Sequence, residues 1–217
     1  HRDLHSFPTR RSSDLYDLAA DGELSADRSS LVVRFQAGRG AFGDRAAGAP
    51  FHVDAPAPFR PAGAAPTALE GGTIRDYAVR AGDALSDSWP LAPFADGQYH
   101  LRIHGPNGFY RELRGNAQDP ELAIRLAGSA SDPRAILTLH NSGTRDLTVE
   151  IADLSYGQPT RAVAVPAGAK LEVALSLASS QGWYDLGLGI SGQSVYARRY
   201  SGHVETGRDS VSDPLLG

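Results

Sequence analysis

The sequence predicts an all-β protein made of two tandem β-sandwich modules. Three observations support this: apolar residues recur with a period of two, clusters of turn-forming residues separate these runs, and two stretches of the chain resemble each other. A period of two is the period of a strand with one face buried. No window of a dozen residues shows the i, i+3, i+4, i+7 spacing of an amphipathic helix, so we expect little helix.

The alternation is clear in residues 31–36, 99–104, 170–177 and 184–190, each of which places its apolar side chains on one face. Turn-forming clusters lie between such runs. They are Gly105-Pro106-Asn107-Gly108, Asn141-Ser142-Gly143 and Pro166-Ala167-Gly168. Alternating runs bounded by such turns are typical of strands in a half-solvated sheet.

Two parts of the chain align with each other. Residues 97–101 (GQYHL) match 182–186 (GWYDL), and residues 109–115 (FYRELRG) match 196–202 (YARRYSG). The offset is 85 residues for the first pair of segments and 87 for the second. A repeat of this length indicates two copies of one module, because the repeats of a solenoid are shorter.

The second copy covers residues 121–207, and residues 208–217 form a C-terminal tail. It contains seven alternating runs, which lie near 122–127, 135–140, 146–153, 161–165, 170–177, 182–190 and 194–204. Seven short strands with regular turn signals predict an immunoglobulin-like sandwich.

The first copy covers residues 16–115 and is longer than the second. If Leu31 corresponds to Ile136, the offset there is 105 residues, so the first copy holds about 20 extra residues. We place them in an insertion near 55–72, which is rich in Pro, Ala and Gly and lacks periodicity. The linker, residues 116–120, is short, so the modules should lie close together. Its Asp119-Pro120 pair is a turn signal.

The first residues have a different character. Residues 5–15 read HSFPTRRSSDL, which matches the translation of a common sequencing-adapter oligonucleotide in one reading frame. A transit peptide and a basic arm are the alternatives, and the apolar core of a secretory signal is missing. We therefore expect residues 1–15 to be a disordered artefact. The natural sequence then begins near Tyr16, inside a longer protein.

Composition narrows the classes of function. The net charge is −4, so the chain lacks the basic surplus of a nucleic-acid-binding protein, and we predict no nucleic-acid partner. Cysteine is absent, which excludes disulfides, thiolate metal ligands and a cysteine nucleophile. No apolar run is long enough to cross a bilayer as a helix.

The chemical motifs in the sequence are weak. Residues 38–43 fit G-x-G-x-x-G, but Gly48 and Pro50 interrupt the helix that a dinucleotide site requires. His100 and His104 share a strand face, yet about 3.3 Å per residue separates them by roughly 13 Å, too far for one metal ion. There is no G-x-S-x-G, H-E-x-x-H or P-loop motif. The sequence therefore predicts no catalytic centre, no metal and no cofactor in this chain.

Aromatic and basic residues near the ends of the strands are the candidates for binding. In the neighbouring pairs Trp183-Tyr184 and Phe109-Tyr110, alternation sends one ring to the core and one outward. An outward ring suits a lipid interface, and packing at a sheet edge or between modules is the alternative. Strand arginines can bind phosphate head groups or simply keep a strand soluble. Our candidates for a lipid-binding or interdomain surface are Trp183, Tyr110, Arg111, Arg198 and Arg199.

Several of these segments carry a family resemblance. Residues 105–111 (GPNGFYR), 182–186 (GWYDL) and 198–207 (RRYSGHVETG), followed by 212–214 (SDP), resemble the bacterial phospholipase C C-terminal domain. This domain occurs as a tandem pair at the end of phosphocholine-preferring phospholipases C, and the resemblance covers nearly all of residues 16–217. It implies an N-terminal phosphoesterase domain before Tyr16 that cleaves phosphatidylcholine or sphingomyelin. It also implies export, and hence a secreted or periplasmic protein.

Three hypotheses follow. The first is a non-catalytic pair of modules that packs on, or orients, the phosphoesterase domain of the same parent chain. The second is a module of another secreted protein that binds a phospholipid membrane surface or a carbohydrate, which rests on fold analogy. An independent hydrolase ranks last, because the sequence has no catalytic motif.

Overall fold

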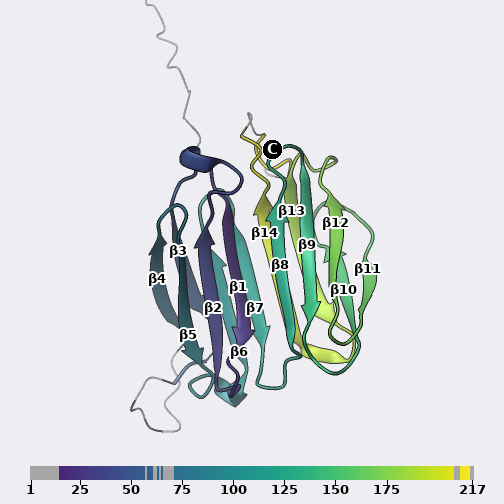
Figure 1. Ribbon diagram of the computed structural model, residues 1–217. Coiled ribbons are helices and arrows are strands. Elements are labelled where there is room, and N and C mark those ends of the chain that lie inside the picture. Colours follow the sequence, from purple (N-terminus) through teal and green to yellow (C-terminus); the bar gives the residue numbers. More distant parts are fainter. Residues whose placement is uncertain are drawn as a thin grey trace, which may run out of the picture.

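The computed structural model describes residues 15–56, 58–60, 63, 65, 71–207 and 211–215. These residues form fourteen β-strands and two short 3-10 turns, with no α-helix among them (Figure 1). The predicted all-β fold is therefore confirmed. The described part of the chain also contains no long apolar helix that is able to cross a membrane.

Each half of the chain contributes seven strands. The first seven are β1 (Leu18–Leu24), β2 (Ser30–Ala37), β3 (Ala49–Ala55), β4 (Thr73–Val79), β5 (Ala84–Pro90), β6 (Tyr99–His104) and β7 (Tyr110–Gly115). The second seven are β8 (Leu122–Gly128), β9 (Arg134–Asn141), β10 (Leu147–Asp153), β11 (Arg161–Val165), β12 (Lys170–Ser176), β13 (Trp183–Ile190) and β14 (Gln193–His203). The bounds of the second set agree with the predicted strands to within one residue.

The two halves have the same topology. In the first half, the sheet β1-β2-β5 faces the strands β4-β3-β6-β7, and in the second half β8-β9-β12 faces β11-β10-β13-β14. The last strand of each half, β7 and β14, pair antiparallel with each other. One layer of the molecule is therefore a continuous eight-stranded sheet that spans both halves (Figure 1). The sequence did not predict this shared sheet.

The other layer is divided. Strands β1 and β8 lie side by side at the edges of the two three-stranded sheets, but no hydrogen-bonded ladder joins them (Figure 1). We call this line the β1–β8 seam. The β7–β14 pair lies in the opposite layer, so residues that point inward from that pair face the seam.

Each half has its own apolar core. The alternate residues Leu31, Val33 and Phe35 of β2 are fully buried in the first core, and Leu137 and Leu139 of β9 are fully buried in the second. Burying such a side chain contributes about 1.5–3 kcal/mol. The apolar residues that recur with a period of two in the sequence are therefore the residues that fill the two cores.

The register between the copies differs by one residue from the sequence alignment. The inward residues of β9 are Ala135, Leu137 and Leu139, so Leu31 corresponds to Ala135 and not to Ile136. A slip of one residue exchanges the two faces of a strand, which is why burial corrects the alignment.

The extra length of the first half lies in two loops. Residues 56–72 separate β3 from β4, against 154–160 in the second half, and most of the longer loop lies outside the described residues. Residues 38–48 separate β2 from β3, against 142–146, a difference that the sequence comparison did not detect.

The segment predicted to be an artefact lies outside the described residues except for Leu15. Leu15 is buried, and its carbonyl accepts the N–H of Ala47 at 2.9 Å.

Candidate functional site

Two buried arginines mark the junction of the halves. Along β7, Arg111 is in phase with the inward Leu113, and along β14, Arg198 is in phase with the inward Tyr200. Arg111 is therefore only 1% exposed and Arg198 6%. In the antiparallel ladder Arg198 stands opposite Leu113 and Arg111 opposite Tyr200. Arginine is seldom buried without a partner, so these two side chains require an account of their contacts.

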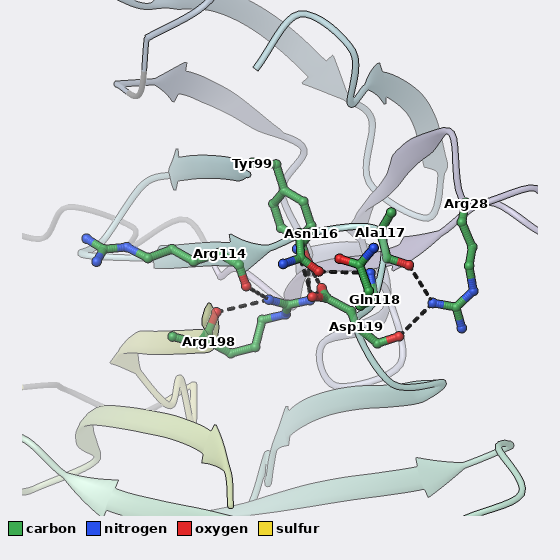
Figure 2. A network of polar contacts seen from close by, with 9 residues as sticks. Arg28, Tyr99, Arg114, Asn116, Ala117, Gln118, Asp119 and Arg198 are labelled. Atoms are coloured by element: carbon green, nitrogen blue, oxygen red, sulfur yellow. Dashed lines mark hydrogen bonds and ion pairs between the residues drawn. The ribbon is translucent and has the colours of Figure 1, made fainter. Parts of the chain in front are cut away.

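The guanidinium of Arg198 is held by hydrogen bonds to the first half, by an ion pair with the linker and by a ring of its own strand (Figure 2). Its guanidinium donates to the carbonyl oxygen of Arg114 at 2.5 Å and to the Tyr99 hydroxyl at 2.7 Å. It lies 3.5 Å from Oδ2 of Asp119, which also accepts the hydroxyl proton of Tyr99. The ring of Tyr196 covers the guanidinium at 4.1 Å. A buried charge is thus matched by a carboxylate, two oxygens and an aromatic face.

The linker between the halves supplies that carboxylate. The backbone N–H of Asn116 donates to Oδ1 of Asp119 at 2.8 Å, which orients the side chain inward. From the turn between β1 and β2, Arg28 donates to the carbonyl oxygens of Ala117 and Asp119, both at 2.8 Å (Figure 2). The residues around Asp119-Pro120 do turn the chain, and they also carry a buried ion pair that the sequence analysis missed.

The environment of this ion pair favours one protonation state. Burial, together with the Asp119 carboxylate, raises the pKa of the Tyr99 hydroxyl above its ordinary value, against the opposing effect of Arg198. Tyr99 therefore remains a hydrogen-bond donor at neutral pH. Removing one member of a buried ion pair leaves a charge without compensation, which costs about 3–5 kcal/mol.

Arg111 repeats these contacts at the other end of the junction. It donates to the carbonyl oxygen of Ser201 at 3.0 Å and to the Tyr184 hydroxyl at 3.2 Å, and the Phe109 ring covers it at 4.1 Å. Each arginine also donates to the carbonyl of the residue before it. The equivalent residues are those that the repeat aligns, namely Arg111 with Arg198, Tyr184 with Tyr99, Ser201 with Arg114 and Phe109 with Tyr196. The junction therefore has an approximate twofold symmetry.

The symmetry fails at the carboxylate. Within the described part of the chain, no carboxylate oxygen lies within 4 Å of the Arg111 guanidinium, and its Nε is buried without a partner. The nearby acid Asp21 of β1 is paired instead with Arg125 of β8 across the seam, at 3.5 Å. Burial raises the pKa of Asp21 to about 6, although Arg111 and Arg125 oppose this shift.

A cleft of about 200 Å³ opens next to Arg111. Its wall includes parts of β1 and β8 at one end of the seam, together with Arg111, Tyr184 and Gly202. A second cleft, of about 210 Å³, lies at the other end of the seam beside Arg198 and Asp119.

Two of the predicted candidates lie on the outer face of the eight-stranded sheet. Arg199 makes a two-pronged ion pair with the buried Asp185, both contacts being 2.7 Å, and Ser155 and Ser201 donate to the same carboxylate at 2.6 Å. These hydrogen bonds lower the pKa of Asp185 although burial opposes the effect. The Arg199 guanidinium lies 5.7 Å from the ring centre of Tyr110.

Trp183 lies at the junction, where β13 begins. Its indole N–H donates to the carbonyl oxygen of Val211 at 2.9 Å, and its ring lies 4.9 Å from that of His203. A Cβ added at Gly108 would lie 3.1 Å from the indole, so this ring packs against the first half of the chain. Packing between the halves was the alternative to a lipid-facing ring, and the binding role of Trp183 stays a prediction.

The histidines form separate pairs with acids. His100 lies 2.6 Å from Glu112 and His52 lies 2.7 Å from Asp76. Burial lowers the pKa of His100, partly offset by Glu112. Across the described ranges, no group of three or more His, Cys, Asp or Glu residues is placed to hold a metal ion. The glycine motif of residues 38–43 leads into a single 3-10 turn, Gly43–Arg45.

The structure therefore separates the five candidates into three groups. Arg111 and Arg198 form an interior pair, and Tyr110 and Arg199 form an outer pair. Trp183 lies at the start of β13. The acids and tyrosines around the interior pair were not predicted from the sequence. The usable signal was the position of both arginines on the apolar phase of their strands, at equivalent places in the repeat.

Comparison with known proteins agrees with this two-part arrangement. A family model described as "Bacterial phospholipase C, C-terminal domain" matches residues 8–116 and 120–203, one segment for each half. The first match begins at residue 8, within the stretch predicted to be an artefact.

Curated relatives cover a similar part of the chain. The "Non-hemolytic phospholipase C" of Pseudomonas aeruginosa is 38% identical over 151 residues, which is 65% of this chain and 21% of that protein. The "Hemolytic phospholipase C" of the same organism is 34% identical over 161 residues, or 66% of this chain and 20% of that protein. A "Non-hemolytic phospholipase C" of Burkholderia pseudomallei is 31% identical over 147 residues, or 64% and 21%. The matched region is about a fifth of each relative.

Among solved structures, the transglutaminase of red sea bream covers 80% of this chain and 29% of its own, at 14% identity and a TM-score of 0.25. A superposition this loose carries no argument about fold or function.

Proposed function

The chain belongs to the bacterial phospholipase C C-terminal domain family, and we propose that it is a non-catalytic accessory region of a secreted, phosphocholine-specific phospholipase C. In this proposal an N-terminal phosphoesterase domain of the parent chain hydrolyses the phosphodiester bond of phosphatidylcholine or sphingomyelin. The accessory region packs on that domain and orients it. The relatives support the division of labour, because the matched region is only about a fifth of their length.

The observation that carries the proposal is the shared eight-stranded sheet. Two modules on a flexible linker would move independently, whereas the β7–β14 ladder and the buried Arg198–Asp119 pair join the halves into one body. A rigid body can hold an attached catalytic domain at a defined angle. We also propose that each half is an immunoglobulin-like sandwich, since each has three strands facing four.

We propose that the outer face of the eight-stranded sheet contacts the catalytic domain. Its polar side chains are already ordered by one another, as in the Arg199–Asp185 and His100–Glu112 pairs. Side chains that are fixed before binding lose less conformational entropy in an interface. Tyr110 and Arg199 lie on this face, and in this proposal they form part of the interdomain surface.

A graft tests the proposal. The corresponding region of the Pseudomonas aeruginosa non-hemolytic relative is replaced by this chain, and phosphocholine release from phosphatidylcholine vesicles is measured. We expect the graft to restore activity that a relative without the region has lost, and the isolated chain to release nothing. Turnover by the pure chain, or full activity of the truncated relative, would contradict the proposal.

The contact face is tested within the same graft. Changing Tyr110→Ala together with Arg199→Ala should reduce activity severalfold, because both side chains lie on the proposed interface. Lys170→Ala is the matched control, since Lys170 is exposed on β12 in the opposite layer and should leave activity unchanged. Thermal melting of each graft separates a lost contact from a lost fold.

The alternative function is a module that binds a lipid surface or a carbohydrate. It receives less support from Trp183, because the indole N–H is already bonded to Val211 and the ring packs against Gly108. Sedimentation of the chain with phosphatidylcholine vesicles, and glycan binding, test this alternative. Binding that Trp183→Ala weakens would favour it over the accessory role.

A further inference from the structure

The two ends of the β7–β14 junction differ in one group. At the first end, the Asp119 carboxylate fills the space above Gly115, so that a Cβ added to this glycine would collide with it. The same carboxylate contacts Arg198 and Tyr99. Gly115, Tyr99 and Arg198 thus surround a buried carboxylate.

The equivalent residues at the second end are Gly202, Tyr184 and Arg111, and all three line the cleft of about 200 Å³. The cleft therefore lies where the symmetry of the junction places a second carboxylate.

Two donors at this end have no acceptor among the described residues. The Nε of Arg111 is buried without a partner. The Tyr184 hydroxyl accepts a hydrogen bond from Arg111, but no oxygen of the described residues accepts its own proton, whereas Tyr99 donates its proton to Asp119. Leaving a buried donor without an acceptor costs free energy, so these groups favour an oxygen-rich occupant.

We propose that this cleft binds a small oxyanion, a phosphate or a carboxylate, in the position that Asp119 fills at the other end. Arginine recognises both groups well because its N–H donors match their oxygens. Arg125 lines the same cleft and adds a second positive charge. The volume is below the range of about 300–1,000 Å³ that drug-sized ligands need, which limits the occupant to a small group.

Acidic residues also line the cleft, and their contacts make the proposal specific. Glu205 accepts from Asn107 at 3.1 Å, and Asp17 accepts the backbone N–H of Ala41 at 3.4 Å. Asp21, close by, is paired with Arg125. These three acids outnumber the two arginines, so we expect weak binding that depends on the position of Arg111 and not on a net positive charge of the cleft.

The test titrates the whole chain with sodium phosphate and follows backbone amide resonances by NMR. We expect saturable shifts at Tyr184 and Gly202. Gln36→Glu adds a negative charge to the cleft wall without changing its shape, and Arg125→Gln removes a positive one. Each should raise the dissociation constant at least about threefold. Both substitutions avoid Arg111, whose loss would disturb the junction itself.

Two matched controls carry the same chemical changes elsewhere. Gln98→Glu and Arg145→Gln lie at exposed positions outside the cleft and should bind phosphate like the unmodified chain. No saturable shift at tens of millimolar phosphate, or equal weakening by the controls, would overturn the proposal.

Titrations with other ligands identify the source of the oxyanion. Acetate separates carboxylates from phosphates, and glycerol 3-phosphate and phosphatidic acid vesicles separate a free phosphomonoester from a lipid head group. A site for free oxyanions should bind phosphate or acetate in solution. Binding to the vesicles with no response to any soluble anion would contradict a small-oxyanion site.

Discussion

The two ends of the junction between the halves are built from the same parts but closed differently. A cleft of similar size lies beside each arginine, but only Arg198 has a carboxylate in contact with it, that of Asp119. We call the Arg198 end of the junction the closed end and the Arg111 end the open end. The chain connection explains the difference, because the linker after β7 turns back over Gly115, while the chain after β14 runs past Phe42 and Leu15. The equivalent strands β7 and β14 thus place the two arginines symmetrically, and the linker after β7 supplies a carboxylate to only one of them.

The largest expected difference between the ends is energetic. Arg198→Met leaves Asp119 buried without a counter-ion, and should lower the free energy of unfolding by about 3–5 kcal/mol. Arg111→Met leaves no carboxylate at contact distance in the described residues, and should cost about 1–3 kcal/mol, mainly from unsatisfied oxygens. Urea denaturation of both variants measures the difference.

The double variant Arg198→Met/Asp119→Leu provides the control, because removing both charges together should recover part of the loss. Equal losses at Arg111 and Arg198 would show that the carboxylate makes no difference between the two ends.

The next effect concerns pH and the acid nearest the open end. The pKa of Asp21 is raised to about 6 in the folded state, so Asp21 binds a proton more tightly in the folded chain than in the unfolded chain. The stabilisation is complete below the unfolded pKa of about 4 and is lost as the pH rises through about 6. A rise in the pKa of Asp21 from about 4 to about 6 corresponds to about 3 kcal/mol of stability. Asp21→Asn should remove that part of the pH dependence in urea titrations between pH 4 and 7.

Asp87 serves as a control of opposite sign. Although burial raises it, hydrogen bonds from Tyr77 and Arg75 lower the pKa of Asp87, so its stabilisation is present above the unfolded pKa and is lost at acid pH. Asp87→Asn should therefore change the dependence of stability on pH only at acid pH. If Asp21→Asn leaves the dependence of stability on pH unchanged between pH 4 and 7, the pKa of Asp21 is not raised in the folded chain.

A smaller effect is expected at the closed end. Arg28 holds the linker through two hydrogen bonds to the carbonyl oxygens of Ala117 and Asp119. Its side chain is partly exposed, so water replaces some of what Arg28→Ala removes, and we expect a loss of about 2 kcal/mol in urea denaturation. Arg145→Ala, at an exposed site, is the control. A loss no greater than the control would mean that the linker keeps its shape without Arg28.

The sequence predicted the strands well and the junction poorly, for one physical reason. Alternation reports which side chains share a face, and in the second half this placed every strand to within one residue. The same alternation put Arg111 and Arg198 on the buried phase, but a charged residue was interpreted as solvated. What makes burial tolerable is a partner distant in sequence, such as Asp119 for Arg198, and no local pattern contains that information. The pairing of β7 with β14 also joins residues that are distant in sequence, so no local pattern predicts it.

The smallest predicted effect tests how far the symmetry extends. Tyr196 covers Arg198 as Phe109 covers Arg111, each at 4.1 Å, but the Tyr196 hydroxyl is buried with no partner in the described part of the chain. Tyr196→Phe removes this unsatisfied group and makes the ends alike, so stability should stay the same or rise by up to about 1 kcal/mol. Phe109→Tyr adds a hydroxyl at the open end, where the adjoining cleft can admit water, and should cost less than about 1 kcal/mol. A loss of more than 1 kcal/mol in Tyr196→Phe would instead mean that a bound water or an unrecognised acceptor satisfies the hydroxyl, and that the closed end is less dry than its carboxylate pair indicates.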